Sequence, residues 1–102
     1  MDVVAAFACS HTGLIVTRKD DAPAGQRDAV YGMFAKIRDR VSELRPDALV
    51  VIAADHQRAF PLSGIPAFSV GVGPTAEGMG DAGLPTCRVD VHQQIGQAVL
   101  EG

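Results

Sequence analysis

Aromatic residues and cysteines are scarce in this sequence. Its 102 residues include no tryptophan, one tyrosine and four phenylalanines. A pocket built from this chain alone therefore has few of the aromatic walls that carry much of the binding energy in many sites. The two cysteines, Cys9 and Cys87, lie in unrelated contexts and form no CxxC pair. This count excludes a disulfide framework and a CxxC zinc site.

Clustered positive charge and long apolar runs are also absent. Nine basic residues are scattered among twelve acidic ones, and the net charge is −3. Nucleic-acid-binding domains gather basic residues on one face, so we expect no nucleic-acid partner. No apolar run approaches the roughly 20 residues of a membrane span, and the N-terminus lacks the basic start of a signal peptide. We expect no membrane partner and a cytoplasmic location.

Two common catalytic motifs do not occur. The glycines of Gly71-Val-Gly-Pro74 belong to neither a GxGxxG nor a GxxxxGK[ST] pattern, which argues against a phosphate-binding loop. Ser10 lacks the G-x-S-x-G setting of a serine hydrolase.

The hydrophobic pattern that is present predicts an α/β fold. Residues 3–9 and 48–53 are apolar on both faces, as in the inner strands of a parallel sheet. Between them, apolar side chains recur at helical spacing up to Arg45-Pro46, where proline disfavours further helix. These apolar positions are Val30, Met33, Phe34, Ile37, Val41 and Leu44. Strand, helix and strand in this order predict a right-handed βαβ crossover. We expect residues 1–102 to form one α/β domain with a mostly parallel sheet, or the N-terminal portion of a larger one.

Shorter elements complete the prediction. Residues 14–16 are expected to be extended, 17–25 to form a surface loop, and the glycine-rich segment 73–83 to form a flexible loop. Short strands are expected at 68–72 and 86–89. A final helix follows with Asp90 as its N-cap, and His92 in this helix is assigned a structural role.

Two histidines follow the two predicted inner strands. His11 and His56 are 56 − 11 = 45 residues apart, one βαβ unit, so both would leave the sheet at the carboxyl edge where α/β proteins bind ligands. Imidazole pairs suit iron, zinc, copper and nickel, so the metal stays open at this point, as does the alternative that both are ordinary loop residues. Asp55 either orients the imidazole of His56 or accepts backbone hydrogen bonds in the loop.

Several stretches together resemble the class III extradiol ring-cleavage dioxygenases. This superfamily includes the 2,3-dihydroxyphenylpropionate dioxygenases and, more distantly, the β-subunit of protocatechuate 4,5-dioxygenase. The resemblance covers nearly the whole chain in register. The matching stretches are Cys9-Ser-His-Thr-Gly-Leu14, Arg45-Pro-Asp-Ala-Leu-Val-Val-Ile-Ala-Ala-Asp-His56, and Phe60-Pro-Leu-Ser-Gly-Ile-Pro-Ala-Phe-Ser-Val-Gly-Val-Gly73, followed in order by Thr75-Ala-Glu-Gly78 and Leu84-Pro85.

The resemblance implies a mononuclear Fe(II) held by two histidines and one glutamate, with open positions for a catechol-type substrate and O2. By this resemblance His11 and His56 are the histidine ligands, roughly 3 to 4 Å apart. Asp55 is assigned a supporting catalytic role beside His56. We also expect a homo-oligomer.

The chain departs from the family pattern at two points. Gly13 stands where the family usually has proline, which is expected to loosen the loop of His11. The family's glutamate ligand and acid/base histidine come from the later part of longer chains, and neither Glu77 nor Glu101 lies in a matching context. We therefore expect an incomplete N-terminal portion of a dioxygenase or a degenerate relative, prone to association. The alternatives are a non-catalytic metal- or partner-binding domain that keeps the fold, and a relative that uses zinc or binds a peptide.

Overall fold

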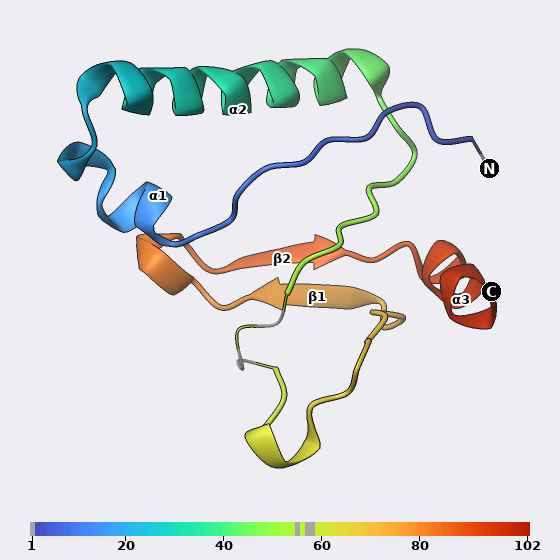
Figure 1. Cartoon of the computed structure of the whole chain (residues 1–102). Coiled ribbons are helices and arrows are strands. Elements are labelled where there is room, and N and C mark those ends of the chain that lie inside the picture. The colour runs from blue at the N-terminus through green and yellow to red at the C-terminus, as the bar shows by residue number, and fades with distance from the viewer. Residues whose placement is uncertain (1, 55, 57–58) are drawn as a thin grey trace. The chain divides into compact units, whose positions relative to one another are not determined.

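The computed structural model describes residues 2–54, 56 and 59–102. Its contacts divide the chain into two units, Met1–Asp47 with Gly78–Thr86, and Ala48–Glu77 with Cys87–Gly102. Figure 1 shows the elements of both units. In the described part of the chain, no helix is long and apolar enough to cross a membrane.

The longest element is the helix α2, Ala24–Leu44, in the first unit (Figure 1). It begins after Pro23, whose fixed φ favours a helix start. It ends where Arg45 adopts the left-handed region with φ 45° and donates its N–H to the Val41 carbonyl oxygen at 3.0 Å. This αL cap, followed by Pro46, confirms the helix end that the sequence predicts.

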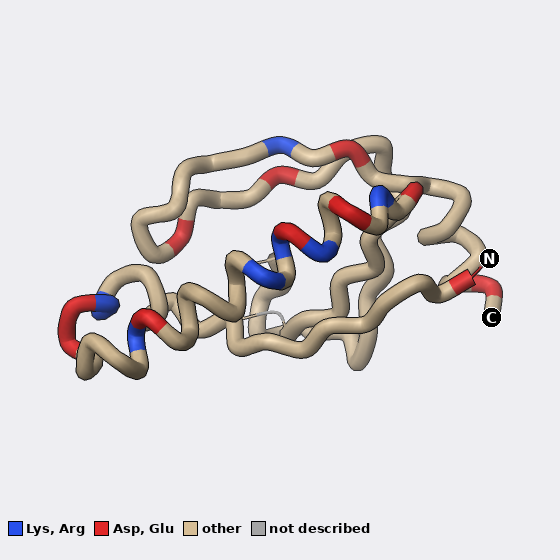
Figure 2. The backbone as a smooth tube through the Cα atoms, turned by 90° about the horizontal axis from the view of Figure 1, so that it is seen from above, with Lys and Arg blue, Asp and Glu red and all other residues tan. Residues whose placement is uncertain are grey.

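Acidic and basic residues alternate along α2 (Figure 2). Exposed ion pairs join Arg38 to Asp39 at 2.8 Å and Arg40 to Glu43 at 3.0 Å. Pairs this exposed each contribute little to stability, commonly about 0–1 kcal/mol. The charged side chains therefore mark a solvated surface and are not what holds the helix in place.

A short helix, α1, covers Leu14–Thr17, and a 3-10 turn, η1, follows at Lys19–Asp21. The expectation of an extended segment at residues 14–16 is therefore wrong, and the predicted loop at 17–25 holds η1 and the start of α2. Local hydrogen bonds explain the difference, because the Gly13 carbonyl oxygen accepts from the backbone N–H of Val16 and of Thr17 and from the Thr17 hydroxyl, at 3.0–3.1 Å. These bonds outweigh the weak β preference of Ile15 and Val16.

Two strands pair in an antiparallel sheet, β1 at Thr75–Gly78 and β2 at Cys87–Asp90 (Figure 1). The strand expected at 86–89 is thus confirmed with a shift of one residue. The segment 73–83, expected to be a loop, instead contains β1 and a 3-10 turn, η3, at Asp81–Gly83. Its glycines serve the turn, since Gly80 and Gly83 have φ of 76° and 77°.

The last helix, α3, covers Gln93–Glu101 in the second unit. Its N-cap is His92, whose Nδ1 accepts from the Ile95 N–H at 3.4 Å, so the expectation of Asp90 as N-cap is wrong and the structural role of His92 is confirmed. The Gln93 side-chain amide donates to the Val72 carbonyl oxygen at 2.9 Å. The helix is thereby fastened to the backbone of the segment before β1.

The helices and sheet confirm an α/β fold class, whereas the parallel βαβ crossover stays a prediction. In the described part of the chain, residues 3–9, 48–53 and 68–72 form no strand. A strand needs a neighbouring strand to bond its N–H and C=O groups, and no strand pairs with these segments in the described part of the chain. Their side chains are correspondingly exposed: Val3 is 82%, Val51 81% and Ile52 95% exposed. Among the described residues no hydrophobic side chain is fully buried.

Candidate metal centre

His11 lies in the first unit, between an extended segment and α1. The residues on either side of it form short local hydrogen bonds. The Thr12 N–H donates to the Ser10 hydroxyl at 3.5 Å, and the Leu14 N–H donates to the Thr12 hydroxyl at 3.4 Å. The helix α1 begins at Leu14, and its N-cap is Gly13. His11 lies two residues before this N-cap, on an exposed stretch of chain.

His56 lies in the second unit, after the apolar segment 48–53, and is also exposed. Asp55 lies outside the described residues, so its supporting role stays a prediction. The expected short distance between the imidazoles of His11 and His56 also stays a prediction, since the two histidines belong to different units.

The two histidines provide part of the donor set that Fe(II) requires. Neutral imidazole nitrogens suit Fe(II), and two of them make up the histidine part of a facial triad. In residues 2–54, 56 and 59–102, no group of three or more His, Cys, Asp or Glu side chains could hold a metal ion. The described chain thus supplies ligands of suitable chemistry, without a complete coordination sphere.

The two carboxylates considered from the sequence lie on regular elements. Glu77 is an exposed residue of β1. Glu101 ends α3 and accepts a hydrogen bond from the Gln97 side-chain amide at 2.8 Å, one turn earlier. Neither residue belongs to a metal-binding group within the described part of the chain.

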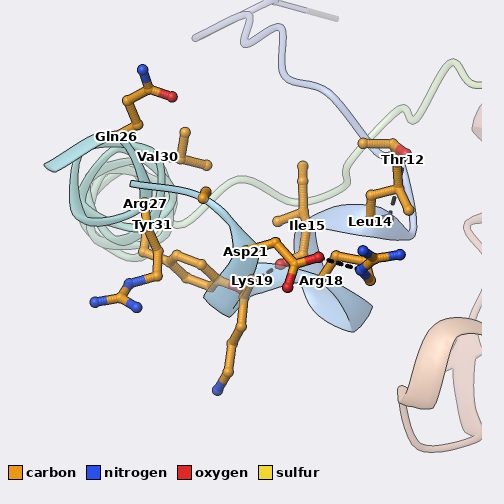
Figure 3. Close-up of a pocket in the computed structure, with 11 residues that line it drawn as sticks. Thr12, Leu14, Ile15, Arg18, Lys19, Asp21, Gln26, Arg27, Val30 and Tyr31 are labelled. Carbon is orange, nitrogen blue, oxygen red and sulfur yellow. Dashed lines mark hydrogen bonds and ion pairs between the residues drawn. The ribbon is translucent and has the colours of Figure 1, made fainter. Parts of the chain in front are cut away.

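The first unit contains a pocket of about 360 Å³, whose lining begins at Thr12, the residue after His11. It lies between α1, η1 and α2, and its apolar lining includes Leu14, Ile15, Val30 and Tyr31 (Figure 3). In Figure 3 the Tyr31 ring reaches from α2 toward Ile15, and the phenol donates to the Ile15 carbonyl oxygen at 2.6 Å. The volume falls in the range of about 300–1,000 Å³ typical of small-molecule pockets.

Charged side chains surround this pocket and pair with one another. Arg18 forms an ion pair with Asp21 (Figure 3), and Arg27 pairs with Asp20 at 3.4 Å and with Asp28 at 3.3 Å. The charged ends of Lys19 and Arg27 point away from Leu14 (Figure 3). The interior of the pocket is therefore suited to an uncharged apolar group. The two arginines of the lining, Arg18 and Arg27, are already paired with carboxylates, which lowers their attraction for a strongly anionic ligand.

Sequence reasoning missed Tyr31 and Ala82 as parts of the region around His11. Tyr31 is the single tyrosine of the chain, but tyrosine occurs on many helix surfaces and gives no specific signal. Ala82 lies in the glycine-rich segment, and its side chain packs against Gly13. The contact joins residues far apart in the sequence, so no local pattern could have revealed it.

Comparison with known proteins adds a second kind of observation. A family model described as the catalytic LigB subunit of aromatic ring-opening dioxygenase matches residues 5–102. Two 2,3-dihydroxyphenylpropionate/2,3-dihydroxicinnamic acid 1,2-dioxygenases, from Escherichia coli strains K12 / DH10B and O157:H7, are 34% identical to the chain over 71 residues. The match covers 70% of this chain and 22% of each relative, so it spans about a fifth of their length. No solved structure matches the chain.

Proposed function

We propose that this chain, which belongs to the family of catalytic LigB subunits of aromatic ring-opening dioxygenases, supplies His11 and His56 to a mononuclear Fe(II) centre that cleaves catechol-type rings with O2. The observation that carries this proposal is the family match over residues 5–102, which includes both histidines. The motifs around His11 and His56 indicate the same family.

Fe(II) bound by two imidazoles and a carboxylate would offer open positions to a catechol and to O2. The task of this chain is to present two neutral imidazole nitrogens at one place. The apolar strands expected at 3–9 and 48–53 would achieve this if they lie side by side, since each would deliver its histidine at the same sheet edge. Asp55 would then fix the tautomer and orientation of the neighbouring imidazole.

The pocket beside α1 has a role in this proposal. Because Thr12 and Leu14 line it, the pocket begins one residue after His11. Its apolar lining would receive the part of the aromatic substrate that faces away from the metal. Burying an apolar group there is worth about 25 cal/mol per Å² removed from water.

The proposed centre also needs a carboxylate, and no group of three metal-ligating side chains occurs in the described part of the chain. With two ligands alone, Fe(II) would be held weakly and ring cleavage would be slow. The same observation favours the second candidate function, a non-catalytic metal- or partner-binding domain that keeps the family fold.

Anaerobic Fe(II) titration of the complete 102-residue chain tests the proposal. We expect one weakly bound Fe(II) per chain, with binding lost in His11→Ala and in His56→Ala. The matched control is His92→Asn, which removes the third histidine of the sequence but keeps a residue that can cap α3. Binding that is unchanged in both alanine variants would refute the assignment.

Oxygen uptake separates the two candidate functions. The chain is combined with the part of the Escherichia coli K12 relative that lies beyond the matched segment, and a catechol is added with Fe(II). We expect oxygen consumption that depends on His11 and His56. Stable Fe(II) or Zn(II) binding with no oxygen consumption in this mixture would favour the non-catalytic domain.

A further inference from the structure

We infer that Gly13 and Ala82 form a packing pair that positions His11. A Cβ atom added at Gly13 would lie 3.0 Å from the Cβ of Ala82. Ordinary contacts between carbon atoms are about 3.5–4.0 Å, so a side chain at position 13 would push the two segments apart. The metal-binding part of this inference depends on the function proposed above, whereas the packing pair itself does not.

Space, and not backbone freedom, is the reason for glycine at position 13. Gly13 has φ −58° and ψ −21°, a helical conformation that every residue adopts readily. Proline has a fixed φ close to this value, so the backbone angle of Gly13 would accept the family's usual residue. A proline there would place its Cβ about as close to the methyl group of Ala82, 3.0 Å, as any other side chain would. The expectation that glycine loosens this loop stays a prediction, and the close contact gives a second reason for glycine here.

The other side of the contact is held by a tight turn. Ala82 has φ 56° and ψ 31°, in the left-handed region that residues other than glycine rarely occupy. Gly80 before it has φ 76°, and a Cβ there would approach the Leu84 carbonyl oxygen at 3.0 Å. The Leu84 N–H closes the turn on the Asp81 carbonyl oxygen at 3.0 Å. The turn η3 contacts α1, so Ala82 is presented to Gly13 by a segment with little freedom to withdraw.

Hydrogen bonds hold Gly13 in α1 and separately join the residues before and after His11. The Gly13 carbonyl oxygen accepts from Val16 and Thr17, which fixes it in the first turn of α1. The Thr12 hydroxyl accepts from Leu14, and the Ser10 hydroxyl accepts from Thr12. A displacement of Gly13 is thus passed to the short stretch that carries the imidazole. Gly13 and Ala82 act as positioning residues and do not touch the metal themselves.

Four variants of the complete chain test the pair. Gly13→Ala introduces the close contact, Ala82→Gly removes the methyl group, and Gly13→Ala/Ala82→Gly restores the space. The control, Gly32→Ala, adds a methyl group in α2 where nothing lies within 4 Å of the new Cβ. The first measurement is the NMR spectrum of the His11 imidazole in the metal-free chain, and the second is Fe(II) affinity.

We expect Gly13→Ala to shift the His11 ring signals and to weaken Fe(II) binding about tenfold, the lower end of the loss seen when groups that orient a metal ligand are changed. The double variant restores the space, so it should recover the His11 signals. Its Fe(II) affinity should lie within about twofold of that of the original chain, a difference of about 0.4 kcal/mol. Gly32→Ala should leave both unchanged.

Two results would overturn the inference: His11 signals that do not respond to Gly13→Ala, or a double variant as perturbed as the single one. If no variant and not even the original chain binds Fe(II), the proposed function fails. The imidazole signals still decide the packing pair in that case, so the two failures are distinguishable.

Discussion

The Tyr31 hydroxyl donates a hydrogen bond of 2.6 Å to the carbonyl oxygen of Ile15. This bond joins the long helix α2 to the short helix α1, which begins at Leu14, shortly after His11. An isolated helix of four residues is far too short to be stable in water, so α1 depends on contacts of this kind.

Tyr31→Phe should loosen α1 without altering α2. The ring stays in place while the hydrogen bond is lost, at a cost of about 0.5–1 kcal/mol because water can reach the carbonyl oxygen in its place. Backbone amide exchange checks this. The N–H of Arg18, bonded to the Leu14 carbonyl oxygen at 3.0 Å, should exchange roughly two- to fivefold faster, and that of Arg45 at the end of α2 should not change. Equal acceleration at both amides would contradict a local role for Tyr31.

Gly96→Ala should destabilise the second unit. Gly96 is buried, and a Cβ there would lie 2.7 Å from the Gly71 carbonyl oxygen, a backbone atom that cannot move aside alone. Overpacking costs about 1–3 kcal/mol, which exceeds the helix-propensity gain of about 1 kcal/mol for replacing glycine by alanine. Thermal unfolding followed by circular dichroism should show a lower midpoint.

The matched control for Gly96 is Gly32→Ala, because this α2 position has open space around the new methyl group. It keeps the propensity gain without the clash, so its midpoint should rise or stay equal. Midpoints that move in the same direction for both variants would refute the close packing of α3 on the segment around Gly71.

His92→Ala should shorten α3, because its side chain accepts from the Ile95 N–H at the start of the helix. Loss of an N-cap costs about 0.5–2 kcal/mol, and this long bond of 3.4 Å places His92 at the lower end. His92→Asn should keep the helix, since asparagine is among the best N-caps. Helical content measured by circular dichroism distinguishes the two, and an equal loss in both variants would show that the cap is not what matters.

The parts of the fold that could be predicted from the sequence depend on local signals. The end of α2 follows from Arg45-Pro46, since a proline acts on the residue directly before it. The helix α1 was missed because Ile15 and Val16 favour strands, while the hydroxyls of Thr12 and Thr17 that stabilise the turn give no distinctive pattern. The parallel pairing of residues 3–9 with 48–53 is a non-local property, and in the described chain these segments lack the neighbours that would make them strands.

In the candidate site, too, the local features could be predicted from the sequence and the non-local ones could not. The family and the two histidines were predicted from motifs, because Cys9-Ser-His11 and Asp55-His56 are contiguous in the sequence. The packing of Gly13 against Ala82 was not predicted, since it depends on the positive φ of Ala82, which no propensity favours. Departures from local preference of this kind become visible only in three dimensions.

The exposed apolar segment at residues 48–53 should make the isolated chain associate. Val51 is 81% and Ile52 95% exposed, and an extended apolar segment with unpaired backbone groups is a template for pairing with another chain. Ile52→Lys should oppose this by placing a charge where a second chain would pair. Sedimentation velocity over a range of protein concentrations should show larger species for the original chain and fewer for this variant.

Leu62→Lys is the matched control, since Leu62 is 74% exposed but lies in the short turn Leu62–Gly64. It should associate like the original chain, and an equal effect of both lysines would mean that net charge, not the apolar segment, governs association.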